Sequence, residues 1–434
     1  MFDIHNGDCA DVMASMESNS VDAIVTDPPY GLSFMNKEWD SFGTDTRQPG
    51  DEHYWVPDNA YGRAKVRYGW NQNKSKLRDS MEMFQAAMTP IFEEALRVAK
   101  PGAHLLCFGG TRTFHRMACA IEDAGWEIRD CIMWVYGSGF PKSMDVGKAI
   151  DKALGAEREK VPNPNSAKPS PQDTGRYGAY GPTDYVEPTP ATDAAARWDG
   201  WGTCLKPAWE PIIVARKPLD GTVANNVLKW GVGALNIDAC RVEYEDGGTA
   251  ATNPLIRELR GCKNNHNPDT NGTSWSVNPN GKTAHANMKG RFPANLVHDG
   301  SQMVLDLFPE SNCGKGGPTL HHTDGQRNSF GAFNNQDGVV TYRHGGNGSA
   351  ARFFYCAKAS KKERGEGNHH PTIKPIALMK WLVTLVTPEG GVVLDPFAGS
   401  GTTLLACKEL GRSCIGIERE PEYVEIIKRR LGEA

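Results

Sequence analysis

Short apolar runs alternate with amphipathic stretches along much of this chain, and Gly, Pro or a single acid ends most of them. Apolar runs of this length are typical of buried strands. They lie at 2–6, 21–25, 103–108, 126–135, 209–216, 391–394 and 413–417. Helices are expected between them, at about 9–16, 80–99, 113–123, 402–410 and from Pro421 onward. Strands and helices that alternate in this way predict an α/β sheet.

Two of the predicted helices show one apolar face at the helical period, which indicates packing against a core. In the first, the face consists of Phe84, Ala87, Met88, Ile91, Phe92, Ala95 and Leu96. In the last, it consists of Tyr423, Ile426, Ile427 and Leu431.

Three stretches interrupt this alternation. Residues 31–80 are polar and aromatic and too long for an ordinary connection, which favours a functional insertion or lid. Seven prolines lie between Pro162 and Pro190, so 156–200 is expected to be a mobile linker or loop. Residues 220–360 are rich in Gly, Asn and His and predict an irregular α+β region.

The strand at 21–25 ends in a turn with the sequence Asp27-Pro28-Pro29-Tyr30. Because proline lacks the N–H that a strand or helix needs, this turn presents its groups rather than hiding them. The Asp27 carboxylate and the Pro28 carbonyl are acceptors beside the flat ring of Tyr30, which suits a planar ring with an exocyclic amine. A purely structural turn is the competing interpretation, since Asp-Pro commonly begins one.

A second motif follows the strand near residue 392. Gly399 and Gly401 let the backbone bend tightly and approach a ligand, and the helix from Thr402 points its N-terminus at that ligand. The next strand ends in Glu418, about 20 residues after the first of these glycines, which matches an acid that binds ribose hydroxyls in dinucleotide-type folds.

Composition narrows the class of protein. The 434 residues are 39% hydrophobic, enough for a sizeable core, while 47 Gly and 28 Pro imply many loops. No run of about 18 apolar residues and no basic-then-apolar leader is present, so a soluble cytoplasmic protein is expected. The 11 cysteines include no Cys-x-x-Cys pair, and therefore neither a disulfide framework nor a metal site is predicted.

The net charge of −4 does not by itself indicate a nucleic-acid-binding protein. Two regions are locally basic, however. Between Tyr61 and Arg78, Lys and Arg alternate with aromatic residues and no acid intervenes, a pattern that suits phosphate contacts and base stacking but also a solvated loop. The second region, within 220–360, contains Lys263, His266, Lys282, Lys289 and Arg291, and is expected either to contact base edges or to be a loop-rich insertion.

Together these motifs resemble those of the amino-group DNA methyltransferases that depend on S-adenosylmethionine. The resemblance rests on Asp-Pro-Pro-Tyr at 27–30, on Asp-Pro-Phe-Ala-Gly-Ser-Gly-Thr at 395–402, and on His-Pro-Thr-Ile-Lys-Pro at 370–375. The catalytic motif precedes the cofactor motif, as in the permuted beta class.

The resemblance implies a mixed seven-stranded, Rossmann-like α/β sheet with an inserted recognition region. Its layout would be 1–155 for the catalytic half with an insertion at 36–80, 156–204 for a Pro-rich linker or loop, 205–219 for a core strand, 220–365 for target recognition, and 366–434 for the cofactor-binding half.

The resemblance also implies site residues. Asp27, Pro28, Pro29 and Tyr30 would be catalytic. Phe397, Gly399, Ser400 and Gly401 would line S-adenosylmethionine, with Asp395 near its methionine part and Glu418 near its ribose. Asp8 and Cys9 would lie beside the adenine ring, and Thr372 and Lys374 would close over the methionine end. The cofactor set also includes Asp27, Pro396 and Thr402.

The implied reaction is methylation of adenine N6 in double-stranded DNA, on a base flipped out of the duplex. Adenine is preferred because the family's adenine enzymes usually carry Asp first in the catalytic motif, whereas Ser is commoner in enzymes that act on cytosine N4. N4-cytosine methylation, RNA or glutamine acceptors, and a non-catalytic DNA-binding role on this scaffold are the alternatives. A homodimer is left open, since dimers are common in the family.

Overall fold

The structure is a computed structural model, and it describes residues 2–31, 76–139, 143–158, 161–162, 185–186, 189–243, 290–312, 317–320, 340–343, 347–357, 363, 368–370 and 372–432. The predicted insertion at 36–80 lies outside these ranges except for its last five residues, where a helix begins. The basic and aromatic stretch from Tyr61 also lies outside them, as do Lys263, His266, Lys282 and Lys289. The chain divides into two compact units, one of Met1–Gly137 with Trp209–Ala434 and one of Ser138–Ala208.

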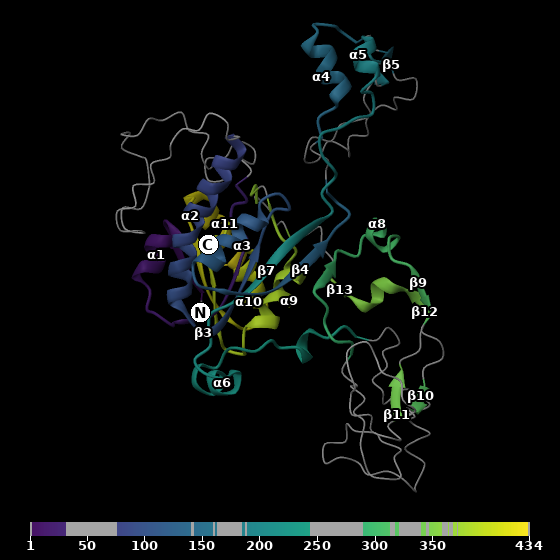
Figure 1. Cartoon of the computed structure of the whole chain (residues 1–434). Coiled ribbons are helices and arrows are strands. Elements are labelled where there is room, and N and C mark those ends of the chain that lie inside the picture. The colour runs from purple at the N-terminus through teal and green to yellow at the C-terminus, as the bar shows by residue number, and fades with distance from the viewer. Residues whose placement is uncertain are drawn as a thin grey trace, which may run out of the picture. The chain divides into compact units, whose positions relative to one another are not determined.

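In the described part of the first unit, nine strands form one sheet (Figure 1). In spatial order these are β1 (Phe2–Asn6), β15 (Ser413–Glu418), β14 (Val392–Asp395), β2 (Val21–Thr26), β3 (Ala99–Phe108), β7 (Trp209–Arg216), β4 (Glu127–Val135), β8 (Leu296–His298) and β13 (Tyr355–Cys356). Strand β7 runs antiparallel to β3 and β4, and the other pairings are parallel.

The mixed α/β class is therefore confirmed, but the predicted strand count is wrong. The seven strands expected from the apolar runs are all present, and β8 and β13 extend the sheet beyond β4. These two strands contain three and two residues, which is too short to stand out as apolar runs. Both come from the region predicted for target recognition.

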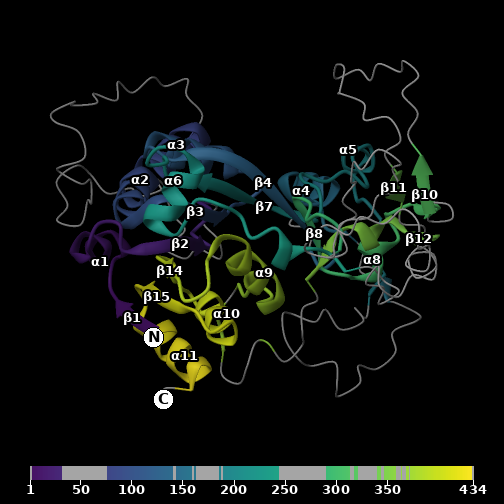
Figure 2. The ribbon, with the colours of Figure 1, turned by 90° about the horizontal axis from the view of Figure 1, so that it is seen from below.

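Helices cover both faces of the sheet (Figure 2). One face carries α1 (Cys9–Ser15), α2 (Lys76–Val98) and α3 (Phe114–Asp123), and the other carries α9 (Ile376–Val386), α10 (Thr402–Glu409) and α11 (Pro421–Leu431). Strand β3 shows why two cores form: Leu105 and Cys107 pack with the first set of helices, and Leu106 and Phe108 pack with the second. A strand that is apolar on both faces is buried between two layers, as the sequence predicted.

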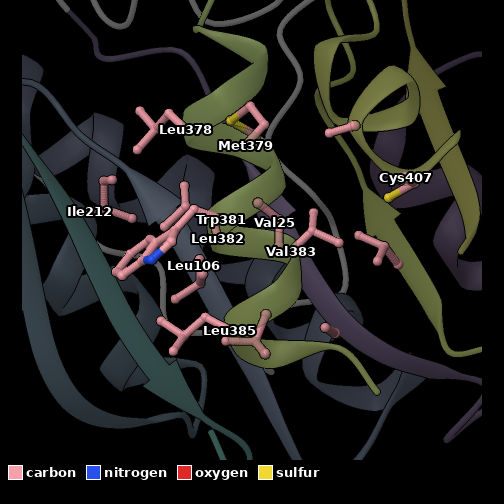
Figure 3. Close-up of a cluster of buried hydrophobic side chains, with 14 of the residues drawn as sticks. Val25, Leu106, Ile212, Leu378, Met379, Trp381, Leu382, Val383, Leu385 and Cys407 are labelled. Carbon is pink, nitrogen blue, oxygen red and sulfur yellow. The ribbon is translucent and has the colours of Figure 1, made fainter. Parts of the chain in front are cut away.

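Helix α9 was not predicted. It fills the second core, where its side chains meet Val25, Leu106 and Ile212 of the sheet and Cys407 of α10 (Figure 3). Because seven of its eleven residues are buried, it lacks the polar stripe that marks an amphipathic helix. The ring of Trp381 in this helix also stacks on the ring of Tyr355 in β13, with the two centroids 5.3 Å apart.

The start of β3 differs from the prediction. The strand begins at Ala99, directly after α2, and its pairing with β2 shifts register between Val21 and Ala23. The shift coincides with Gly102, whose φ is +79°. Asn226 of α6 (Val223–Trp230) is fully buried beside this irregularity and donates to the carbonyl oxygens of Pro101 and Val232, at 2.9 and 2.7 Å.

The remaining described elements are short. In the first unit they are η3 (Asp238–Cys240), α8 (Gln302–Leu305), β9 (Glu310–Asn312), β10 (Gly317–Leu320), β11 (Val340–Arg343), β12 (Asn347–Ser349) and η4 (Ala350–Phe353). The pairs β9–β12 and β10–β11 are antiparallel. The described helices do not include one with the length and apolarity that a bilayer crossing needs.

The second unit contains α4 (Val146–Ala153), β5 (Val161–Pro162), β6 (Tyr185–Val186) and α5 (Asp193–Ala196). Its centre is the buried carboxylate of Asp151. This group pairs with Arg158 at 2.6 Å and accepts hydrogen bonds from the Ala191 N–H and the Thr192 hydroxyl, at 3.1 and 2.8 Å. Because a buried charge needs such partners, these contacts hold α4 against residues 158, 191 and 192.

Candidate active site

The Asp-Pro-Pro-Tyr turn begins directly after β2, in the middle of the sheet. The Tyr30 hydroxyl donates to Asp27 Oδ1 at 2.8 Å and so closes the turn on itself. Pro28 is buried and Pro29 is half-buried, while the Asp27 carboxylate remains partly accessible. The turn therefore holds a carboxylate and a phenol ring together at the carboxyl end of a parallel strand, which is the edge where open α/β sheets bind ligands.

Lys374 lies against this turn, although more than 340 residues separate it from Tyr30 in sequence. Its Nζ is 2.8 Å from Asp27 Oδ2, 3.0 Å from Glu210 Oε2 and 3.0 Å from the Tyr30 hydroxyl oxygen. Burial by itself lowers the pKa of Lys374, but the carboxylates of Asp27 and Glu210 hold that pKa above its ordinary value. The ammonium group is therefore charged at neutral pH. It also lies 4.8 Å from the centroid of the Phe108 ring.

Glu210 links a second tyrosine, Tyr136, to the cluster of Asp27, Tyr30 and Lys374. It lies in β7 opposite Trp134 of β4, and it accepts a hydrogen bond of 3.2 Å from the Tyr136 hydroxyl. Tyr30 Oη is 3.3 Å from the other Glu210 oxygen. Burial raises the pKa of both tyrosines, and the neighbouring acids raise it further, so both phenols stay protonated and act as donors.

Sequence reasoning missed Glu210 and Tyr136. The available signal for Glu210 was a charged residue inside the apolar run 209–216, which is unusual for a central strand. For Tyr136 no motif was available, because it follows directly after the end of β4.

Asp395 lies at the carboxyl end of β14, which pairs with β2. The Thr26 hydroxyl donates to Asp395 Oδ1 at 2.7 Å, and the Phe397 N–H donates to the same oxygen at 3.2 Å. Burial raises the pKa of Asp395 to about 6, against the lowering effect of these hydrogen bonds. Pro396 is buried and Phe397 is half-buried next to it.

The Gly-rich turn after β14 folds onto the end of β15. Gly399 and Gly401 have φ values of +54° and +76°, which residues with a Cβ rarely adopt. The Gly399 N–H donates to Glu418 Oε2 and the Glu420 N–H donates to Glu418 Oε1, both at 2.8 Å. Burial raises the pKa of Glu418 to about 7, although these two hydrogen bonds lower it.

Ser400 and Thr402 have a structural partner in Arg430 of α11. One guanidinium nitrogen of Arg430 lies 2.5 Å from the Ser400 carbonyl oxygen and 3.2 Å from the hydroxyl oxygens of both Ser400 and Thr402. These hydroxyls anchor the Gly-rich turn to the last helix. The sequence motif gave no sign of this partner.

Asp8 and Cys9 lie at the carboxyl end of β1, the strand next to β15. Asp8 Oδ1 accepts the Ala10 N–H at 2.9 Å and caps α1, and the Gly7 N–H donates to the Glu418 carbonyl oxygen at 3.1 Å. Cys9 is buried, and burial raises the pKa of its thiol to about 12. The sheet therefore brings the first predicted motif beside Glu418.

His370 and Thr372 precede Lys374 in the chain. The carbonyl oxygen of Thr372 lies 2.5 Å from His370 Nδ1, and the Thr372 side chain is exposed. The His370 ring packs edge-on against Tyr423, with centroids 4.6 Å apart. A Cβ placed on Gly399 would lie 3.1 Å from His370 Nε2, so the Gly-rich turn can pack this closely on His370 only with a residue that lacks a side chain.

The predicted cofactor residues can be tested against the chemistry of S-adenosylmethionine, which carries a sulfonium and an ammonium group. Asp8, Glu418, Asp395 and Asp27 follow or end four neighbouring strands, so four acids lie at one edge of the sheet. These acids are electrostatically suited to the sulfonium and ammonium groups of the cofactor, whose carboxylate offsets one of the two positive charges. Each Glu418 oxygen keeps a free lone pair for a hydroxyl donor. The residues therefore fit this group. Within the described ranges, no cluster of three His, Cys, Asp or Glu could hold a metal ion.

The chain is similar in sequence to known methyltransferases. Among curated proteins, the Type II methyltransferase M.HindIII of Haemophilus influenzae is 24% identical over 435 residues, which cover 99% of this chain and 94% of that protein. The Type II methyltransferase M.HpaI of Haemophilus parainfluenzae is 47% identical over 77 residues, which cover 18% of this chain and 22% of that protein.

Among solved structures, the M1.HpyAVI–SAM complex matches with a TM-score of 0.37 and 15% identity, covering 99% of both chains. The cytosine-N4-specific PvuII DNA methyltransferase matches with a TM-score of 0.40 and 10% identity, covering 99% of this chain and 86% of that one. The family model described as DNA methylase, N6_N4_Mtase, matches residues 21–429. Because that match spans nearly the whole chain, the protein belongs to this family of S-adenosylmethionine-dependent DNA methyltransferases.

Proposed function

We propose that this methyltransferase is site-specific and transfers a methyl group to the exocyclic N6 of adenine in duplex DNA. The observation that carries the choice of adenine is the acid at the head of the catalytic turn. Asp27 provides a carboxylate beside the Tyr30 ring, and the resemblance assigns an acid at this position mainly to adenine enzymes.

The base would leave the duplex and stack on Tyr30, with its amine donating to Asp27 and to the Pro28 carbonyl. These two hydrogen bonds draw the nitrogen lone pair out of conjugation with the ring. S-adenosylmethionine, when bound, supplies a methyl group on a positively charged sulfur. As the amine nitrogen becomes positive, the Asp27 carboxylate stabilises that charge, and a proton then leaves the nitrogen.

The cofactor would be held by the residues at the edge of the sheet. We assign Glu418 to the ribose hydroxyls, Asp395 to the methionine part, and the turn from Phe397 to Thr402 to close backbone approach. Asp8 and Cys9 are assigned to the adenine end of the cofactor. Support comes from the order of the strands, which places all these residues at the carboxyl ends of β1, β15 and β14.

Target recognition is assigned to residues 220–365. Part of this region is joined to the active site through β8, which pairs with β4 directly before Tyr136. The Gly137 N–H also donates to Asp299 Oδ2 at 2.9 Å, which ties the end of β4 to the loop after β8. A region attached here is well placed to contact bases near the flipped one.

The test is incubation of the purified protein with methyl-labelled S-adenosylmethionine and mixed-sequence duplex DNA, followed by digestion and separation of nucleosides. Label in N6-methyladenine is expected. Label in N4-methylcytosine would refute the choice of base, and absence of label despite cofactor binding would favour the non-catalytic role. Asp27→Ala should abolish transfer while largely sparing cofactor binding, and retained activity would refute the assignment.

A further inference from the structure

The Lys374 ammonium lies where a nitrogen donor to Asp27 belongs. Its Nζ is 2.8 Å from Asp27 Oδ2, the ordinary distance for a charge-assisted N–H···O hydrogen bond. The other Asp27 oxygen already accepts the Tyr30 hydroxyl at 2.8 Å. An exocyclic amine that approached Asp27 would therefore find each carboxylate oxygen already accepting one hydrogen bond, one of them from a full positive charge, and could use only the remaining lone pairs.

We propose that Lys374 is a displaceable occupant of the target-amine position and that Glu210 is the positioning residue that receives it when DNA binds. This inference rests on the proposed function, because it assumes that Asp27 accepts the target amine. It assigns to Glu210 a role that the catalytic motif does not contain.

Charge explains why the lysine must leave. An ammonium group beside Asp27 offsets the negative charge that would otherwise stabilise a positive nitrogen on the base. It also hydrogen-bonds the Tyr30 hydroxyl at 3.0 Å and lies 5.4 Å from the centroid of that ring, on which the base would stack. Lys374 and the target base therefore compete for the same carboxylate and the same ring.

Geometry explains where the lysine goes. Its Nζ is already 3.0 Å from Glu210 Oε2, so it can give up Asp27 and still keep a carboxylate partner. The other Glu210 oxygen is held by the Tyr136 hydroxyl at 3.2 Å, which fixes the carboxylate in place. A buried ammonium that lost both partners would be strongly unfavourable, whereas one that keeps Glu210 remains paired.

Three variants test whether Glu210 receives Lys374 during the reaction or only stabilises the fold. Glu210→Gln keeps the shape but removes the charge that receives the lysine, so Lys374 should stay on Asp27 and the single-turnover rate should fall about tenfold or more. Adding Lys374→Met to that variant removes the occupant, so the rate should recover by about tenfold. Tyr136→Phe is a milder change that loosens Glu210, and a smaller loss in the same direction is expected.

The rates are measured at saturating cofactor and DNA, with cofactor affinity and thermal unfolding recorded for each variant. A double variant no faster than Glu210→Gln would overturn the inference, because a scaffold role predicts that two losses never rescue each other. A wild-type rate in Glu210→Gln would overturn it as well. If the wild-type protein methylates no nucleoside, the proposed function itself is refuted and this role falls with it.

A second measurement does not depend on turnover. Competitive acylation of the DNA-free protein at several pH values, read by mass spectrometry, compares Lys374 with the more exposed Lys380 of α9. Lys374 should become reactive only at higher pH than Lys380, and Glu210→Gln should shift its reactivity to lower pH. An unchanged Lys374 profile in that variant would show that Glu210 does not hold the ammonium, and would overturn the inference.

Discussion

The carboxyl of Glu418 provides a quantitative test of the cofactor end of the site. Its side chain is 9% exposed, and burial raises its pKa from 4.5 to about 7 in the folded protein. Between these two pH values the folded protein holds a proton that the unfolded chain has released. Stability therefore falls as pH rises through this window. At about 1.36 kcal/mol for each tenfold change in proton affinity, the full penalty is about 3 kcal/mol.

The perturbation is Glu418→Gln, which is neutral at every pH and therefore escapes this penalty. Gln can accept only through its single oxygen, so the variant can lose stability by a constant amount. The informative quantity is how the difference in unfolding free energy between variant and wild type changes with pH. Between pH 5 and pH 8 this difference should move in favour of the variant by about 2 to 3 kcal/mol.

The assay is urea denaturation of both proteins at the two pH values. Glu389→Gln is the matched control, since Glu389 is an exposed acid in the turn before β14. Its difference from wild type should change much less. If the Glu418→Gln difference is the same at pH 5 and pH 8, the carboxyl is not neutral in the folded protein near pH 6, and the reasoning from burial fails.

Three other predictions concern cofactor binding, the Gly-rich turn and the start of β3. Because ionised Glu418 is the better acceptor for ribose hydroxyls, wild-type affinity for S-adenosylmethionine should fall below pH 7, by up to tenfold per pH unit, in isothermal titration calorimetry. Gly399→Ala should destabilise more than Gly390→Ala in thermal melts. Both have positive φ, which costs a residue with a side chain about 1 kcal/mol, but a Cβ on Gly399 would lie 3.1 Å from His370 Nε2, whereas a Cβ on Gly390 would have nothing within 4 Å. Asn226→Ala should cost about 2–4 kcal/mol in urea denaturation, since the carbonyl oxygens of Pro101 and Val232 lose the donor that the fully buried Asn226 amide supplies; a loss below 1 kcal/mol would contradict this.

Much of the fold could be predicted because central strands such as β2 and β3 are buried on both faces. Runs such as 21–25 and 103–108 are apolar except for Asp22 and His104, and this property follows directly from helices on both sides of a sheet. Helix α9 was not predicted, for the related reason that it is apolar nearly all round. A run of eleven residues after Pro375 was the available signal, and its length favours a helix over a strand.

The site could be predicted only in part. Asp27, Asp395 and Glu418 could be proposed from the sequence because each stands at the end of an apolar run, where a parallel sheet exposes its residues. Glu210 and Tyr136 enter from β7 and β4, and only the strand order brings them to Lys374. Likewise Arg430 could not be linked to Ser400 from the sequence, because a surface-facing basic residue on a terminal helix has many potential partners.

The hydrogen bond between Thr26 and Asp395 joins positions 369 residues apart, and this separation has a consequence for synthesis. By the logarithmic law for loop closure, bringing such distant positions together costs about 5 kcal/mol of chain entropy. At about 5–20 residues per second, a ribosome needs roughly 20–70 s to make the 369 residues that follow Thr26. During that interval β2 lacks its neighbour β14 and the catalytic turn has no cofactor edge beside it. A chain that has not yet reached Asp395 therefore holds Asp27 without this partner, and methylation can begin only after synthesis has passed Asp395.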